Sequence, residues 1–167
     1  MEQRLKNIFL NGLEEYKEPL LRLCSVYATD EDTIQDLFQE SVLNIYQSLP
    51  SFRGKSNIKT WMYRITLNVC LKLSKTRIRS KVKFVEIAHL ENLIDPSSST
   101  EYLDPRLKKL RACIGRLGES ERALVSLYLE ELPYREISEI TGLSENLVAV
   151  KLKRIRKKLY HCITNTK

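Results

Sequence analysis

The sequence has few of the residues on which catalytic sites and membrane anchors depend. It contains five glycines and two histidines among 167 residues. It has no Ser/His/Asp set, no glycine-rich phosphate loop and no clustered metal ligands, so the pattern argues against an enzyme and predicts no cofactor. No run of eighteen apolar residues occurs, which excludes a membrane-spanning helix, and the N-terminus lacks the residue order of a secretory signal.

The four cysteines are also too scattered to form a recognisable motif. Cys24, Cys70, Cys113 and Cys162 include no C-x-x-C pair, and neither histidine clusters with them in the sequence. Without a secretory signal, the simplest interpretation is four reduced cysteines in the core or on the surface. A metal site that uses His161 and Cys162 together with distant cysteines is the alternative.

The charged residues fall into blocks. Residues 51–83 hold ten basic and no acidic residues, and residues 84–105 hold five acidic and no basic residues. Residues 106–167 are basic again, with fourteen basic and seven acidic residues, whereas residues 1–50 hold nine acidic and four basic residues. Two basic blocks divided by an acidic one predict two separate contacts with a polyanion, joined by a connector that avoids it.

The last thirty residues carry the clearest motif. A short helix is predicted over 134–141, a tight turn at Gly142, an N-cap at Ser144 and a longer helix from 145 to about 160. The longer helix has a basic surface and one apolar stripe, formed by Val148, Leu152, Ile155 and Leu159. This pattern is typical of a helix-turn-helix, whose second helix fits the DNA major groove. The alternative is a solvated basic helix on an ordinary bundle.

The N-terminal part reads as scaffold helices followed by an amphipathic one. Helices are predicted over 3–17 and 19–28, because Pro19 would break a continuous helix. Thr29-Asp30 offers a cap for a helix over 31–49 with an apolar stripe that includes Ile34, Ile45 and Tyr46. The opposite side of that helix carries Asp36, Gln39, Glu40, Leu43 and Gln47. This side could bind a partner protein, and a solvated outer face is an equally good interpretation.

The next segment combines aromatic rings with positive charge. A loop is predicted over 50–57 and a helix over 58–79, with Ile58, Met62, Ile65, Val69 and Leu73 in the core. An adjoining stripe is polar and basic and contains Arg64, Asn68, Lys72, Lys75 and Arg79. With the aromatic side chains Phe52, Trp61 and Tyr63, this mixture suits single-stranded DNA, because cations hold phosphates and rings stack on bases. The alternative for Trp61 is a place in the core.

The remaining pattern gives the domain organisation. Residues 81–104 read as an acidic, polar linker, apart from a brief alternation at 81–87 and a short turn at 86–94. Pro105 suits a helix start, and two further helices are marked by Leu107, Leu110, Ile114 and Leu117 and by Ala123, Leu124, Leu127 and Tyr128. The predicted fold is all-α, with two small helical domains at 1–80 and 105–167.

Three stretches in this order resemble the extracytoplasmic-function (ECF) group of bacterial RNA polymerase sigma factors in the sigma-70 family. They are DLFQESVLNIYQSLPSF at 36–52, TWMYRITLNVCLKLSKTRIR at 60–79 and RALVSLYLEELPYREISEITGLSENLVAVKLKRIRKKL at 122–159. The resemblance covers nearly the whole chain. It implies a transcription initiation factor with core RNA polymerase and promoter DNA as partners, a cytoplasmic location and no membrane contact of its own.

The resemblance also implies roles for the surfaces above. The helix with Asp36 would bind the polymerase clamp helices, and the acidic linker would enter polymerase channels. The 50–57 loop would hold a flipped base of the −10 element, and Trp61 would support the fold. The residues implied to contact the −10 element are Phe52, Arg53, Lys55, Ser56, Asn57, Trp61, Tyr63, Arg64, Asn68, Lys72, Lys75 and Arg79. The −35 element would be read as duplex by Arg135, Ser144, Glu145, Asn146, Leu147, Val150, Lys151, Arg154 and Lys158.

The chain departs from the family pattern where the recognition helix opens. Leu147, Ala149 and Val150 stand where the family often has a threonine, a lysine and a serine, so base contacts there must differ. Pro133 replaces a common capping serine. The family further suggests an anti-sigma protein as a partner. A stand-alone helix-turn-helix regulator, which would bind duplex DNA without polymerase, is the alternative function.

Overall fold

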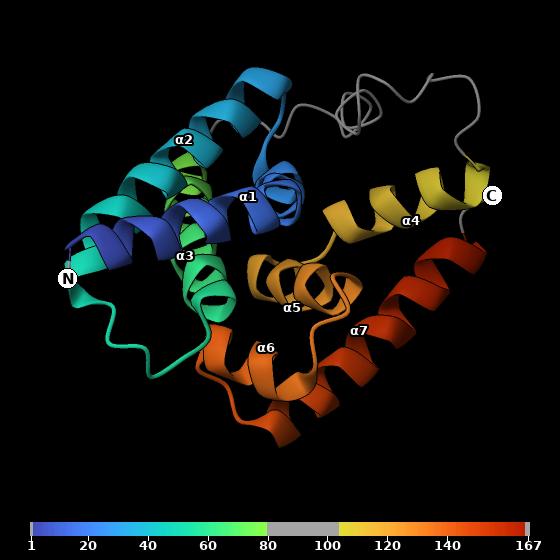
Figure 1. The fold of residues 1–167 in the computed structure, drawn as a ribbon. Coiled ribbons are helices and arrows are strands. Elements are labelled where there is room, and N and C mark those ends of the chain that lie inside the picture. Colours follow the sequence, from blue (N-terminus) through green and yellow to red (C-terminus); the bar gives the residue numbers. More distant parts are fainter. Residues whose placement is uncertain (1, 80–103, 166–167) are drawn as a thin grey trace. The chain divides into compact units, whose positions relative to one another are not determined.

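The computed structural model describes residues 2–79 and 104–165, and within them the chain is helical without strands (Figure 1). Its contacts divide it into two compact units, which we call the N-terminal domain (1–82) and the C-terminal domain (83–167). The predicted all-α fold with two helical domains is confirmed. The predicted linker lies outside the described residues except for Asp104, as do the alternation at 81–87 and the turn at 86–94, and the domain boundaries stay predictions.

Three helices form the N-terminal domain: α1 (Glu2–Tyr27), α2 (Glu31–Ser48) and α3 (Ile58–Arg79), with a 3-10 turn η1 (Leu49–Ser51) after α2. Each of the three packs against the other two. Gly12 allows a close approach of α1 to α3, because a Cβ at this position would lie 3.1 Å from the sulfur of Met62. Asp30 caps α2 as predicted, since its carboxylate accepts a hydrogen bond from the Thr33 amide at 2.7 Å.

The predicted break at Pro19 is wrong, because α1 continues through it. A proline inside a helix removes one hydrogen bond and costs about 3 kcal/mol or more. The next turns bury Leu20 and Leu23, which are 0% and 2% exposed. Burial of a leucine contributes roughly 1.5–3 kcal/mol, so these two side chains offset the proline. Core packing therefore overrides the local preference at this position.

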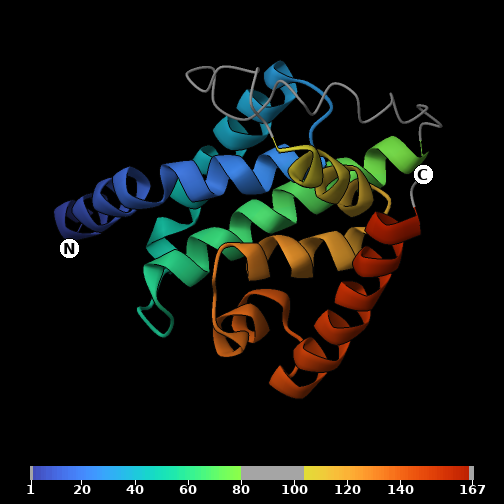
Figure 2. The same ribbon diagram turned by 90° about the vertical axis from the view of Figure 1, so that its right-hand side faces the viewer.

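Four helices form the C-terminal domain: α4 (Pro105–Gly115), α5 (Glu119–Leu129), α6 (Tyr134–Thr141) and α7 (Glu145–Asn165). Helices α4, α5 and α6 all pack on α7 (Figure 2). Asp104 caps α4 by accepting a hydrogen bond from the Arg106 amide at 2.9 Å. The predicted apolar stripe of α7 is confirmed, because its four members are at most 7% exposed. Leu107, one of the residues that mark the predicted helix, lies on the first turn of α4 and is 46% exposed.

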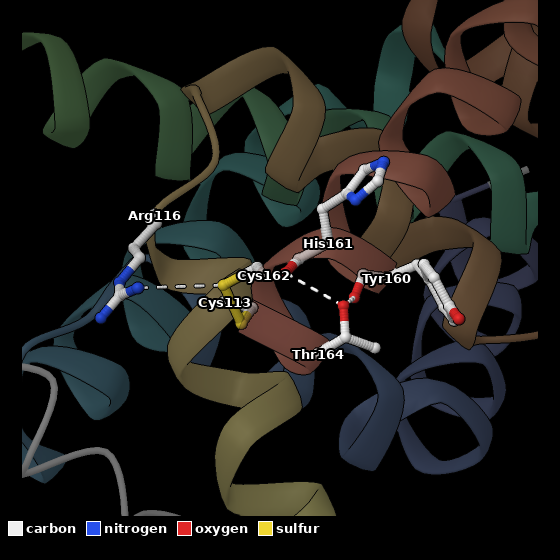
Figure 3. The surroundings of a disulfide bond; sticks show 6 residues. All are labelled: Cys113, Arg116, Tyr160, His161, Cys162 and Thr164. Carbon is white, nitrogen blue, oxygen red and sulfur yellow. Dashed lines mark hydrogen bonds between the residues drawn. A yellow bond between two sulfur atoms is a disulfide. The ribbon is translucent and has the colours of Figure 1, made fainter. Parts of the chain in front are cut away.

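The expectation of four reduced cysteines is wrong for two of them. Cys113 near the end of α4 and Cys162 near the end of α7 form a disulfide, although 49 residues separate them (Figure 3). Sequence spacing could not reveal this pair, because packing of α4 on α7 brings the two Cα atoms to 5.9 Å. The alternative metal site loses its ligand at Cys162, since that sulfur is already bonded.

Cys24 and Cys70 are free and buried in the N-terminal domain. The Cys70 thiol donates a hydrogen bond to the Cys24 sulfur at 4.0 Å. This hydrogen bond and, next, burial raise the pKa of Cys70 well above its ordinary value. Since the thiolate is the reactive form, Cys70 is a chemically protected core residue, and Cys24 is shielded from solvent by burial.

Candidate nucleic-acid interface

The helix-turn-helix is built as the sequence predicts. Gly142 adopts a left-handed conformation with φ of 77° and ends α6, and its amide bonds to the Ser138 carbonyl. The Ser138 hydroxyl donates to the Leu143 carbonyl in the turn. Ser144 then caps α7, because its hydroxyl accepts a hydrogen bond from the Leu147 amide at 3.2 Å. Pro133 precedes α6 and provides no side-chain cap, as predicted.

One face of α7 is exposed opposite its buried stripe. Of the residues predicted to contact the −35 element, Lys151 is half-buried. The others are exposed on α7 or next to it: Arg135, Ser144, Glu145, Asn146, Leu147, Val150, Arg154 and Lys158. Helical spacing places Leu147, Lys151 and Arg154 on a common face at i, i+4 and i+7. Leu147 and Val150 are apolar but 41% and 46% exposed. The face thus combines cations with two aliphatic side chains that the core does not use.

Two of the predicted −35 cations form ion pairs within the domain. Lys158 forms an ion pair with Glu121 of α5, and Arg135 forms one with Glu139 at 3.5 Å. The hydrogen bond from Lys158 is the main cause of the lowered pKa of Glu121. Since the folded-state pKa is depressed, this contribution to stability exists above the unfolded pKa of a glutamate and is lost as pH falls through the folded value. A DNA contact by Lys158 would compete with this pair.

The structure gives Arg156 a packing role that the sequence pattern did not predict. The Arg156 guanidinium lies over the Tyr128 ring, 5.6 Å from its centroid. Such a contact couples α7 to α5 through a cation–π attraction. The basic periodicity of α7 gives no sign of it, because the position of Tyr128 depends on how α5 packs.

The N-terminal domain presents the second basic surface along α3. Arg64, Asn68, Lys72 and Lys75 are all exposed, so the predicted polar stripe lies on the surface of the helix. The side chain of Arg79 lies outside the described residues. The expected role of Tyr63 in base stacking is wrong, because its side chain is 1% exposed. Helix α3 packs against both α1 and α2, so its buried face is wider than the predicted stripe and includes Tyr63.

Phe52, in the loop before α3, packs against Trp61 on the first turn of that helix. The rings of Phe52 and Trp61 lie 5.0 Å apart between centroids, and both residues are half-buried. Gly54 has φ of 68°, which a residue with a side chain adopts only with strain. Arg53, Lys55 and Asn57 are exposed around this pair, and Ser56 is half-buried. The Asn57 carboxamide accepts a hydrogen bond from the Lys59 amide, so it caps α3.

The predicted docking face of α2 is exposed throughout. Asp36, Gln39, Glu40, Leu43 and Gln47 are all exposed, with Leu43 at 53%. Tyr46 lies beside them and is 49% exposed, although the pattern placed it with the core. Its ring makes an edge contact with Phe9 of α1, with centroids 5.6 Å apart. The acidic face therefore has an apolar margin that the sequence pattern assigned elsewhere.

Two family models match the chain, one in each domain. The Sigma-70 region 2 model matches residues 13–81, and the Sigma-70, region 4 model matches residues 107–159. RNA polymerase sigma factor YlaC of Bacillus subtilis is 30% identical over 141 residues, which cover 81% of this chain and 80% of that protein. The chain belongs to the sigma-70 family.

Within that family it is similar to ECF members. The ECF RNA polymerase sigma-E factor of Haemophilus influenzae is 29% identical over 169 residues, covering 94% of this chain and 88% of that protein. The sigma factor RpoE in complex with the anti-sigma factor NepR from Bartonella quintana has a similar fold, with a TM-score of 0.70 at 19% identity, covering 92% of this chain and 97% of that one. This sigma factor therefore belongs to the ECF group.

Membership of the family gives the protein its general role. It is a sigma factor that directs transcription initiation, and the stand-alone regulator is not favoured. Sigma factors are DNA-binding initiation factors. In the described parts of the chain, no helix has the length and apolar character needed to cross a bilayer.

Proposed function

We propose that three separate surfaces of this sigma factor divide the work of initiation. The exposed face of α2 binds core RNA polymerase, the 50–57 loop and the basic stripe of α3 hold the opened −10 element, and the exposed face of α7 reads the −35 duplex. The observation that carries the proposal is the exposure of two cationic helix faces, on α3 and α7, in different domains.

At the −10 element, the loop would capture an unpaired base. Removing a base from the duplex stack costs a few kcal/mol, which contacts in the loop must offset. Arg53 and Lys55 are exposed and supply positive charge for the backbone, while Phe52 and Trp61 form an aromatic pair at the loop base. The cations of α3, among them Lys72 and Lys75, would hold the following phosphates.

At the −35 element, α7 would enter the major groove. Arg154 and Lys151 can donate hydrogen bonds to guanine or to phosphates, whereas Leu147 and Val150 cannot donate any. Exposed aliphatic side chains suit the methyl group of thymine. We therefore propose that the bases nearest the N-terminus of α7 include thymines, and that Arg154 supplies a polar base contact.

A further assignment, an anti-sigma partner, rests on analogy with relatives. The solved RpoE is in complex with an anti-sigma factor, and CnrH is in complex with the cytosolic domain of CnrY. We propose that an anti-sigma protein likewise covers the polymerase-binding or DNA-binding face of this chain. Because core polymerase acts in the cytoplasm, we place this sigma factor there and assign it no reaction of its own.

A reconstitution with core polymerase tests the function. Overexpression followed by sequencing of transcript 5′ ends would give the promoter boxes, and a template carrying them would then be transcribed in vitro. We expect transcripts only when the protein and core enzyme are combined. Tight sequence-specific binding of the protein alone, without any promoter-dependent transcript, would favour the stand-alone regulator instead.

Replacement of Arg154 by alanine tests the −35 surface. We expect a loss of about 1–3 kcal/mol in binding of the cognate duplex and a smaller loss on random duplex, because a base-reading arginine carries specificity. Fluorescence anisotropy over a range of salt concentrations measures both. Lys109→Ala, which removes an exposed cation on α4, is the control and should leave the specificity ratio unchanged. If Arg154→Ala loses the same binding free energy on both duplexes, Arg154 contacts only phosphates and does not read a base.

A further inference from the structure

The C-terminal domain carries a disulfide that the role in transcription does not require. Cys113 and Cys162 join α4 to α7, the helix we assign to DNA recognition. Disulfides rarely persist in the cytoplasm, and those that form there are usually transient and sense redox conditions. We propose that the Cys113–Cys162 pair is a redox-active site that controls the folded population of the C-terminal domain. The cytoplasmic setting and the link to DNA rest on the proposed function.

The two sulfurs differ in access. Cys113 is 4% exposed, whereas Cys162 is half-buried near the end of α7. The exposed Arg116 guanidinium reaches the Cys162 sulfur, with Nη1 3.9 Å away, while the side chains of Tyr160 and His161 point away from it (Figure 3). A positive charge at that distance stabilises a thiolate. Cys162 is therefore the sulfur that exchanges with an outside thiol or disulfide, and Cys113 is the resolving sulfur.

The reaction is an ordinary thiol–disulfide exchange with a low-molecular-weight disulfide as the oxidant. The Cys162 thiolate attacks one sulfur of the oxidant, forms a mixed disulfide and releases one small thiolate. The Cys113 sulfur, after losing its proton, attacks the Cys162 sulfur and expels the second small thiolate. In total, two protein thiols are oxidised, one small disulfide is reduced to two thiols, and the two protons pass to those thiols. Reduction runs the same steps backwards.

Opening the bond matters because few buried side chains support α4 and the end of α7. Within α4, only Cys113 and Ile114 are buried. In α7 the buried stripe ends at Leu159, and Tyr160 beyond it is 67% exposed. The disulfide closes a long loop, since its cysteines are 49 residues apart. Cross-links of such loops favour the folded state by constraining the unfolded chain.

The link to DNA follows from the folded population. Rising by about 1.5 Å per residue, α7 separates Arg154 from Cys162 by roughly 12 Å, so the disulfide acts on the recognition face only through the helix. Apparent affinity scales with the fraction of molecules in the competent state. Reduction therefore leaves DNA affinity unchanged at temperatures where both redox forms are folded. It lowers the affinity strongly where only the oxidised form is folded.

Thermal unfolding of the full chain tests the switch without DNA. We expect reduction to lower the midpoint of the C-terminal transition, followed by circular dichroism, by about 10–25 °C. Trp61, the single tryptophan, reports the N-terminal domain, so its fluorescence transition should not move. Cys162→Ser should unfold at the reduced midpoint with or without reductant. An unchanged midpoint on reduction of the wild type would overturn the proposal.

Alkylation trapping tests the chemistry. The native protein is equilibrated at set ratios of reduced to oxidised glutathione, and we expect Cys113 and Cys162 to titrate together while Cys24 and Cys70 stay unlabelled. Arg116→Ala should slow alkylation of reduced Cys162 several-fold, with Lys109→Ala as the matched cation control. Failure of glutathione to reduce or form the bond in the native state would overturn the redox role.

Binding to the promoter duplex, measured between the two midpoints, tests the functional link. We expect at least a tenfold loss of affinity on reduction of the wild type and no response to reductant in Cys162→Ser. Equal affinity of both wild-type forms at that temperature would overturn the control of DNA binding. If neither form binds any duplex, the proposed −35 role fails, while the unfolding and trapping results still decide the switch.

Discussion

Reversal of two charges on α2, with Asp36→Arg and Glu40→Arg together, is expected to abolish promoter-dependent transcription by weakening polymerase binding 100-fold or more. Both side chains are exposed and lie one turn apart on the proposed docking face. Like charges forced together in an interface cost several kcal/mol, and about 1.4 kcal/mol is a tenfold change in affinity. Binding of labelled protein to core enzyme gives the dissociation constant directly.

The chain offers a matched control for this experiment on α1. Glu14→Arg with Glu18→Arg reverses two exposed carboxylates at the same i, i+4 spacing and changes the net charge equally. We expect this variant to bind polymerase within about threefold of the wild type. If the α2 variant binds core enzyme as the wild type does, the docking face lies elsewhere. If both variants lose binding to a similar extent, general electrostatic attraction rather than α2 carries the interaction.

Truncation of one core leucine, Leu152→Ala, is expected to remove a third or more of the free energy of unfolding of the C-terminal domain. Leu152 is fully buried in α7, the helix on which α4, α5 and α6 pack. A buried Leu→Ala change costs about 3–4 kcal/mol, whereas a unit of this size has a total stability of only about 3–9 kcal/mol. Chemical denaturation followed by circular dichroism measures the loss, and −35 duplex binding should fall in proportion to the folded population.

Val150→Ala is the control for that truncation, because it removes aliphatic carbons two residues away at an exposed position. Its free energy of unfolding should stay within about 0.5 kcal/mol of the wild type, since surface substitutions rarely change stability more. A loss below about 1 kcal/mol for Leu152→Ala would mean that α7 is not the central element of this domain.

The sequence predicted the C-terminal motif well because its signals are local. The Gly142 turn, the Ser144 cap and the apolar spacing of α7 each depend on a few neighbouring residues. Failures came where distant segments decide the outcome. Burial after Pro19 keeps α1 continuous, and contact with two helices buries Tyr63. The Cys113–Cys162 bond depends on how α4 packs against α7, which no local pattern encodes.

The candidate surfaces show the same division between local and distant interactions. A period of 3.6 residues divides each helix into faces, so exposure of the α2 and α7 faces followed from spacing alone. Side-chain pairing across helices did not, because Lys158 meets Glu121 and Arg156 meets Tyr128 only once α5 is in place. Periodicity therefore locates charged side chains on a surface, while packing determines which of them also hold the domain together.

Pro19 makes α1 locally less stable in its middle. Because proline has no backbone N–H, one turn of the helix has one hydrogen bond fewer. The segments before and after that turn also bury different numbers of side chains. Leu20, Leu23, Cys24 and Tyr27 fix the later part, whereas only Phe9 and Gly12 are buried before the proline. Under mildly denaturing conditions, we expect residues 2–18 to unfold locally while the rest of the domain stays folded. A protease would then make its earliest cut there.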